Sequence, residues 1–98
     1  MIIVRDIFQI DPAQMKQATD AAKGMRDINK RLGHPVARIL TDLVGQYYTL
    51  VFESEFADLA TYQRAIESVL KDPDWQAAYR PMRGAIRSGR REIYKLIA

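Results

Sequence analysis

Few residues of this chain could do chemistry, and its single histidine is the first of them. His34 lies between Gly33 and Pro35, in a loop after a predicted helix. An imidazole titrates near pH 6.5, which suits a general base or a haem ligand. The chain has no cysteine and no second histidine, and its carboxylates show no ligand spacing. We therefore predict no metal site and no bound cofactor, and we keep His34 as a ligand-facing candidate.

Polar side chains within strand-like segments form a second group of candidates. Arg5 is the most interesting, because it is central in the apolar segment IIVRDIFQI. A buried charge is costly unless it is paired. Arg5 therefore either faces a ligand or forms an ion pair with an acid such as Asp42 or Glu53. The same requirement applies to the other polar strand residues, which are Asp6, Gln9, Arg38 and Asp42.

Four aromatic residues could line a ligand site. Tyr47 and Tyr48 are adjacent in a predicted strand, so we expect them to face opposite sides of the sheet. Trp75 and Tyr79 share one face of a predicted helix, where they either pack in the core or form a pocket wall. Tyrosine can fill a core and still offer a hydroxyl group, so both roles stay open for all four residues.

The elements that must position these residues follow from the spacing of apolar side chains. Period-two and β-branched patterns predict four strands, at Ile2–Ile10, Val36–Leu43, Gln46–Glu53 and about Arg90–Ile97. Spacings of three and four predict a helix from Pro12 to Gly33, a second from about Phe56 to Asp72 and a third from Pro73. Pro81 predicts a kink or early stop in the third helix.

The order β-α-β-β-α-β predicts an α+β fold, a ferredoxin-like sandwich in one domain spanning residues 1–98. Its four-stranded antiparallel sheet would carry helices on one face. Both faces of the strands hold apolar residues, for example Ile2 and Val4 against Ile3 and Ile7. A sheet of this kind exposes a large apolar patch as a monomer. We therefore expect a homodimer in which a second copy covers the open face, as in a dimeric α/β barrel.

Composition limits the remaining classes of protein. The 98 residues are 48% hydrophobic and 28% charged, with no stretch long enough to span a membrane and no signal-peptide pattern. The absence of cysteine fits a reducing, cytoplasmic compartment. Residues 76–98 hold six basic residues and one acidic residue, either as a solvated face or for an anionic partner. RNA-recognition domains share the element order, but the segment VGQYYTLVF lacks their third-strand motif, so nucleic acid is not favoured.

Three segments carry a family resemblance, and together they extend over nearly the whole chain. They are IIVRDIFQI, LTDLVGQYYTLVFESEFADLATY and SGRREIYKLI. The chain resembles small NIPSNAP-like members of the dimeric α/β-barrel superfamily. That superfamily includes cofactor-independent monooxygenases, haem-binding proteins, dehydratases and ligand-binding regulators. The Asn, Trp and His of its haem-degrading branch do not match Asn29 and His34 in position, so haem is not implied.

The resemblance implies a pocket between sheet and helices, or inside the barrel, that holds a small organic ligand. The first functional hypothesis is a small-molecule site, with a cofactor-independent oxygenase as its catalytic form. The alternative is a non-catalytic homodimeric module for ligand binding or protein interaction, which needs only the fold.

Overall fold

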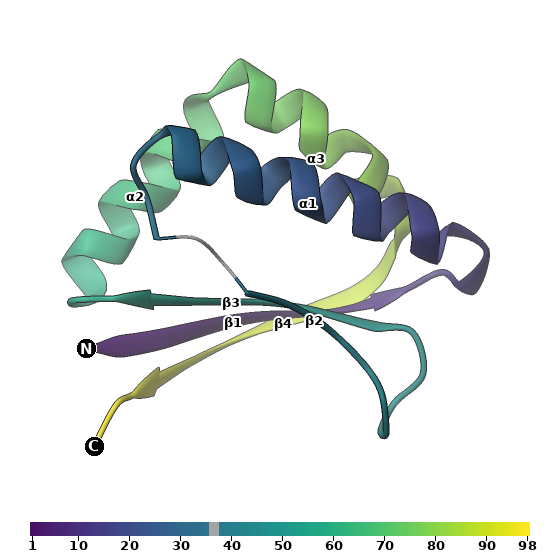
Figure 1. The fold of residues 1–98 in the computed structure, drawn as a ribbon, viewed down its shortest axis with the longest axis horizontal. Helices are drawn as coiled ribbons and strands as arrows, with labels where there is room; N and C mark the ends of the chain where they lie inside the picture. Colours follow the sequence, from purple (N-terminus) through teal and green to yellow (C-terminus); the bar gives the residue numbers. More distant parts are fainter. Residues whose placement is uncertain (36–37) are drawn as a thin grey trace.

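The computed structural model describes residues 1–35 and 38–98 and has two layers, a sheet and a set of helices on one of its faces (Figure 1). Its elements, in chain order, are β1 (Ile2–Ile10), the 3₁₀ turn η1 (Pro12–Gln14), α1 (Met15–Arg31), β2 (Arg38–Thr41), β3 (Thr49–Phe56), α2 (Leu59–Lys71), α3 (Pro73–Ala85) and β4 (Ile86–Lys95). The predicted ferredoxin-like α+β fold is confirmed.

The sheet has the strand order β2-β3-β1-β4, and all of its neighbouring strands are antiparallel. Because side chains alternate along a strand, the register assigns each residue to a face. Val4, Phe8 and Ile10 of β1 point towards the helices, together with Leu50 and Phe52 of β3. This face of the sheet forms the floor of the hydrophobic core.

Helices α1 and α3 pack closely because small residues lie between them. Ala18 and Ala22 of α1 are fully buried. Gly24 of α1 faces α3, and a Cβ atom added to Gly24 would lie 3.9 Å from the Cβ atom of Ala78. Met82 of α3 fills the space that remains over the sheet. The apolar stripe predicted for the first helix is therefore its core-facing side.

Aspartates cap the helices, as the two Asp-Pro pairs predict. Asp11 accepts from the backbone N–H of Ala13, and Asp72 accepts from that of Trp75 at the start of α3. A third aspartate, Asp58, accepts from the backbone N–H of Thr61 and caps α2, although the sequence analysis began that helix at Phe56. These bonds satisfy amide groups that have no partner within the helix.

The cap of α2 makes stability depend on pH. The hydrogen bond from Thr61 lowers the pKa of Asp58. Its carboxylate therefore stabilises the fold above the unfolded-state pKa of about 3.9, and this contribution is lost as the pH falls through the lower folded-state value.

We expect Asp58→Asn to retain the cap but lose that pH dependence, because asparagine caps helices about as well as aspartate. Denaturant unfolding should show wild type more stable than Asp58→Asn at pH 7, with the gap closing in acid. Asp58→Ala, which removes the cap, should be destabilised at both pH values. A constant gap between wild type and Asp58→Asn would contradict the assignment.

Several predicted boundaries are wrong. Val36 lies outside the described residues. β2 ends at Thr41 and β3 begins at Thr49, so the turn that connects them is longer than the two residues between the predicted strands Val36–Leu43 and Gln46–Glu53. Tyr47 and Tyr48 lie in this turn, and Tyr48 has a φ of 58°. They are therefore not strand residues facing opposite sides of the sheet. Gly45 does take a positive φ, and Asp42 accepts from the backbone N–H of Thr49, which closes the turn.

The C-terminal elements also differ from their predicted bounds. Helix α3 continues through Pro81 to Ala85, so the proline does not stop it early. Strand β4 begins at Ile86, directly after the helix, and not near Arg90. Gly89 lies within β4 opposite Phe8, and an added Cβ there would lie 2.9 Å from the Phe8 ring. This glycine therefore makes room for an aromatic side chain.

The face of the sheet away from the helices carries a row of alternating charges. The register places Arg38, Glu53, Arg5 and Glu92 side by side across all four strands. Arg5 Nε lies 2.6 Å from Glu53 Oε2, Arg38 pairs with the other oxygen of Glu53, and only 5% of the Glu53 side chain is exposed. In the next row Leu40, Val51 and Ile7 are apolar neighbours on three strands, and Arg90 of β4 ends the row.

No helix among the described residues is both long and apolar enough to cross a membrane.

Candidate functional site

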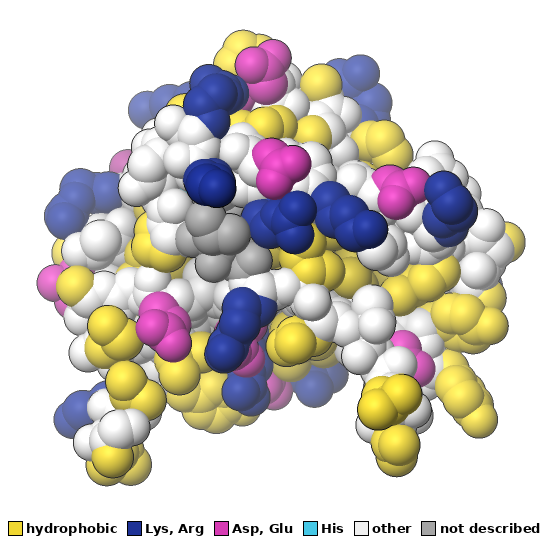
Figure 2. Space-filling model, viewed as in Figure 1, with side chains coloured by type: hydrophobic (Ala, Val, Ile, Leu, Met, Phe, Trp, Pro, Cys, Tyr) yellow, Lys and Arg dark blue, Asp and Glu magenta, His cyan; other side chains and the backbone are white. Residues whose placement is uncertain are grey.

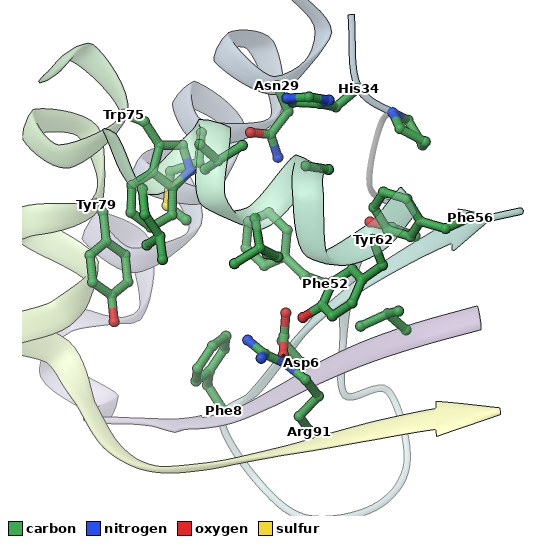
Figure 3. A pocket seen from close by; sticks show the side chains of 18 residues that line it. Asp6, Phe8, Asn29, His34, Phe52, Phe56, Tyr62, Trp75, Tyr79 and Arg91 are labelled. Atoms are coloured by element: carbon green, nitrogen blue, oxygen red, sulfur yellow. Dashed lines mark hydrogen bonds and ion pairs between the residues drawn. The ribbon is translucent and has the colours of Figure 1, made fainter. Parts of the chain in front are cut away.

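A cavity of about 350 Å³ lies between the helices and the helix-covered face of the sheet. Apolar side chains form most of its wall, and polar groups lie at two separate places in it (Figure 3). A cavity of this size, with apolar walls and a few polar groups at fixed positions, is typical of small-molecule binding sites. The lining residues come from β1, β3, β4, all three helices and the segment after α1.

An ion pair and a tyrosine hydroxyl form the polar group nearest the sheet. Asp6 of β1 and Arg91 of β4 are register partners, and Arg91 Nε lies 2.6 Å from Asp6 Oδ1. The Arg91 guanidinium carbon lies 5.7 Å from the centre of the Tyr62 ring, a cation–π distance. In Figure 3 the Tyr62 hydroxyl points from α2 towards this pair.

The environment changes the pKa of two of these groups. Burial raises the pKa of the Tyr62 hydroxyl, and the nearby Arg91 charge only partly offsets this effect. For Arg91, burial lowers the pKa, but the hydrogen bond and the charge of Asp6 outweigh it, so the net shift is upward. Near neutral pH this part of the cavity therefore offers a neutral hydroxyl group beside a paired cation.

Asn29 and His34 form the polar group nearest the end of α1. Gly33 has a φ of 78°, a conformation that glycine adopts easily, and it turns the chain at the helix end. The His34 backbone N–H then donates to the Asn29 carbonyl oxygen at 3.0 Å. This turn places the two side chains next to each other at the upper edge of the cavity (Figure 3).

Aromatic rings form one wall of the cavity. Trp75 and Tyr79 of α3 stack with ring centres 5.0 Å apart and planes 14° from parallel. Phe8 and Phe52 of the sheet lie below them, and Phe8 is held over Gly89. A flat apolar ligand could pack against these rings at close contact.

Three buried polar atoms in the cavity have no hydrogen-bond partner among residues 1–35 and 38–98. They are Asn29 Oδ1, His34 Nε2 and the Tyr62 hydroxyl oxygen. Most buried polar atoms in folded proteins are hydrogen-bonded, and leaving one unsatisfied costs about 1–3 kcal/mol. Three such atoms in one apolar cavity are therefore available to form hydrogen bonds with water or with a ligand.

The structure brings together three of the six candidates from the sequence. His34, Trp75 and Tyr79 line the cavity. Arg5 lies on the opposite face of the sheet, where it is paired with Glu53, one of the two acids considered for it. The remaining two, Tyr47 and Tyr48, lie in the β2–β3 turn with 82% and 43% of their surface exposed.

Sequence reasoning missed several residues of the site. Tyr62 was not singled out within the second predicted helix, and Arg91 was counted only as part of the basic C-terminal segment. Asp6 was noted as a polar strand residue, but nothing local to it pointed to Arg91, 85 positions away. Asn29 was considered only as a poor match to a haem site. The sequence did contain a local indication for Asn29. A glycine after a helix turns the chain back, which brings the following residue, His34, next to the last turn of that helix.

The cavity can bind a ligand oxygen at either polar group and could accept a proton at His34 or Asp6. The described residues contain no group of three histidine, cysteine or acidic side chains that could hold a metal ion.

Comparisons with known proteins agree with this architecture. A sequence profile described as NIPSNAP matches residues 6–98. A NIPSNAP family protein of unknown function from Agrobacterium tumefaciens superposes with a TM-score of 0.85 at 17% identity, over 98% of this chain and 87% of the other. An uncharacterised NIPSNAP domain protein from Burkholderia xenovorans gives 0.84 at 17% identity, over 100% and 96%.

A structure described as an antibiotic biosynthesis monooxygenase superposes with a TM-score of 0.78 at 12% identity, over the full length of both chains. At these identities the structural matches establish the fold alone. No curated protein matches the sequence.

Proposed function

Because the chain belongs to the NIPSNAP family, we propose that it is a small-molecule-binding protein and that the cavity under its helices is the binding site. The observation that carries this proposal is the set of three unpartnered polar atoms in one apolar cavity. A ligand with an apolar ring body and oxygen groups at its ends would satisfy them. Ordered water is the competing occupant, since water also fills polar cavities.

We expect 2-naphthol, a flat apolar probe with one hydroxyl group, to bind in this cavity. Trp75 is the only tryptophan, so its indole N–H gives a single amide-correlation peak that reports binding at the wall. Tyr62→Phe removes one unpartnered hydroxyl and should weaken binding about fivefold, the value of one neutral hydrogen bond. The unbound variant should be at least as stable as wild type, because it loses an unsatisfied group.

Tyr47→Phe is the matched control, since it removes a hydroxyl from a tyrosine outside the cavity. This variant should bind 2-naphthol with wild-type affinity, and the ligand should shift its Trp75 indole peak as it does in wild type. If saturating 2-naphthol did not shift the Trp75 peak, the cavity would not be the binding site. The same conclusion would follow if Tyr62→Phe and Tyr47→Phe weakened binding equally.

The catalytic form of the proposal is a cofactor-independent oxygenase. Its support is the presence of two proton acceptors, His34 and Asp6, in an apolar cavity, and the fold shared with a protein described as a monooxygenase. A phenol would lose its proton to one of these groups, and the resulting anion would give electrons to dioxygen. The O–O bond and one ring C–H bond would break, one oxygen atom would enter the ring as a carbonyl, and the other would leave as water with the phenol proton and the proton from that carbon.

Oxygen uptake during incubation with 2-naphthol separates this form from the non-catalytic one. Uptake that His34→Ala and Asp6→Asn together abolish would support the oxygenase. Binding without any uptake would support a ligand-binding module for this compound class.

We also propose that the open face of the sheet binds a second copy of the chain. In Figure 1 the sheet lies along the 36 Å axis of the molecule, and the β2–β3 turn and the C-terminus curve away from the helices on its open side. A stable interface on this face would bury roughly 800 Å² per partner. The apolar row of Leu40, Val51 and Ile7 would lie at the centre of the interface.

The ends of this face add apolar surface. Leu43 and Val44 at the turn and Ile97 near the C-terminus are almost fully exposed. Yellow side chains gather on the two protrusions at the lower edge of Figure 2. Exposed apolar surface of this extent is typical of protein contact sites. The charged row alternates in sign, so a second copy can place an arginine against the partly exposed Glu92 of the first copy.

A further inference from the structure

We propose that Arg80 and Arg83 of α3 form an anion-binding subsite beside the ligand cavity, and that the ligand is therefore an amphipathic oxyanion, a carboxylate or phosphate with an apolar body. This inference rests on the proposed function, because it names the ligand class of the same cavity.

A second cavity of about 300 Å³ adjoins the first one. Leu70, Trp75 and Tyr79 line both cavities, and Gln76, Arg80 and Arg83 complete the second. The stacked pair of Trp75 and Tyr79 is therefore a wall common to both (Figure 3). A ligand whose ring packs against this wall needs only a short arm to bring a polar group to the two arginines.

The neighbouring polar groups leave both arginines available. The Gln76 side chain donates to the Leu70 carbonyl oxygen at 2.7 Å. Asp72 and Asp74, the acids at the start of α3, both pair with Arg31 of α1. No carboxylate of the described residues pairs with Arg80 or Arg83 in this cavity.

Other arginines of the basic C-terminal segment are neutralised. Arg87 pairs with Asp11, Arg90 with Glu92 and Arg91 with Asp6. Within this segment, the two arginines without an acidic partner among the described residues are thus Arg80 and Arg83, which line the second cavity. Three positions apart on a helix, they lie on one face and can contact the same anion. Guanidinium groups bind carboxylates and phosphates with two parallel hydrogen bonds, which suits this pair.

The test compares (2-naphthyloxy)acetate with 2-(2-naphthyloxy)ethanol, which has a ring and arm of matching size but no charge. By calorimetric titration at low salt, the acid should bind about tenfold more tightly, since an exposed ion pair contributes up to about fivefold for each arginine. This advantage should shrink as salt is added, while the alcohol's affinity stays constant. 2-Naphthyl phosphate in place of the acid shows which oxyanion the subsite prefers.

Arg80→Gln with Arg83→Gln should remove the advantage of the acid and leave binding of the alcohol intact. Arg64→Gln, which changes an exposed arginine of α2 outside both cavities, should preserve it. Equal affinity for acid and alcohol in wild type would overturn the subsite and leave the main cavity standing. If the acid lost its tighter binding only in Arg91→Gln, the anion would bind at Arg91, and the subsite at Arg80 and Arg83 would again be overturned. If neither compound binds, both proposals fail.

Discussion

Replacing Leu50 by alanine should lower the free energy of unfolding by about 3 kcal/mol, within the range of 2–5 kcal/mol for large-to-alanine changes in cores. Leu50 is fully buried near the start of β3. It packs in one cluster with Ile10 below the helices and Met82 from α3. These neighbours come from two other elements, β1 and α3, which are held by their own backbone bonds, so they cannot collapse fully into the space that the leucine vacates.

Leu59→Ala is the matched control, because it makes the same chemical change at a leucine that is 58% exposed at the start of α2, away from the open face of the sheet. It should change the free energy of unfolding by less than about 0.5 kcal/mol. Chemical denaturation of both variants, followed by far-UV circular dichroism, measures the difference. If both variants lost the same stability, Leu50 would not hold the core position described for it.

The core could be predicted from the sequence because its signals are local and repeated. Ala18, Ala22 and Met25 recur at helical spacing, and the same residues are the buried side of α1. In β1, Val4 and Ile10 keep an even spacing and both reach the core. A pattern repeated over many residues can still be recognised when one residue departs from it. The type of each element was therefore more predictable than its first and last residues.

The errors arise where one local conformation decides the outcome. Tyr47 and Tyr48 have the β-propensity of a strand, and a single residue with positive φ, Tyr48, removes them from it. Pro81 lacks a backbone donor, but packing of Met82 and Ala85 on the core holds the helix through it. Tertiary contacts outweigh intrinsic propensity at such positions.

The site was predictable only in part, for a related reason. His34, Trp75 and Tyr79 are recognisable one by one as residues that can contact a ligand. The polar group at the sheet depends on the register of β1 with β4, which joins Asp6 to Arg91, and on α2 placing Tyr62 above them. Such long-range pairings leave no pattern in either segment alone.

The chain should have twice its 11.3 kDa mass in solution, measured by light scattering at micromolar concentration. The reason is the open face of the sheet, where Val51 lies in an apolar row between Leu40 and Ile7. Val51→Lys would place a charge at the centre of the proposed interface, where it would be buried without a partner. We expect this variant to have the mass of a single chain, since an unpaired buried charge costs several kcal/mol.

Two further variants separate loss of pairing from loss of folding. Leu40→Lys changes a 43% exposed residue of the edge strand β2, where a lysine is readily tolerated in a single chain, and it should also yield the single-chain mass. Leu59→Lys makes the same change at a 58% exposed leucine at the start of α2, on the helix side, and should leave the mass doubled. A single-chain mass for wild type would refute the pairing of open faces outright. A doubled mass in both Val51→Lys and Leu40→Lys would move the contact to another surface, because each change would bury an unpaired lysine from both copies in the proposed interface.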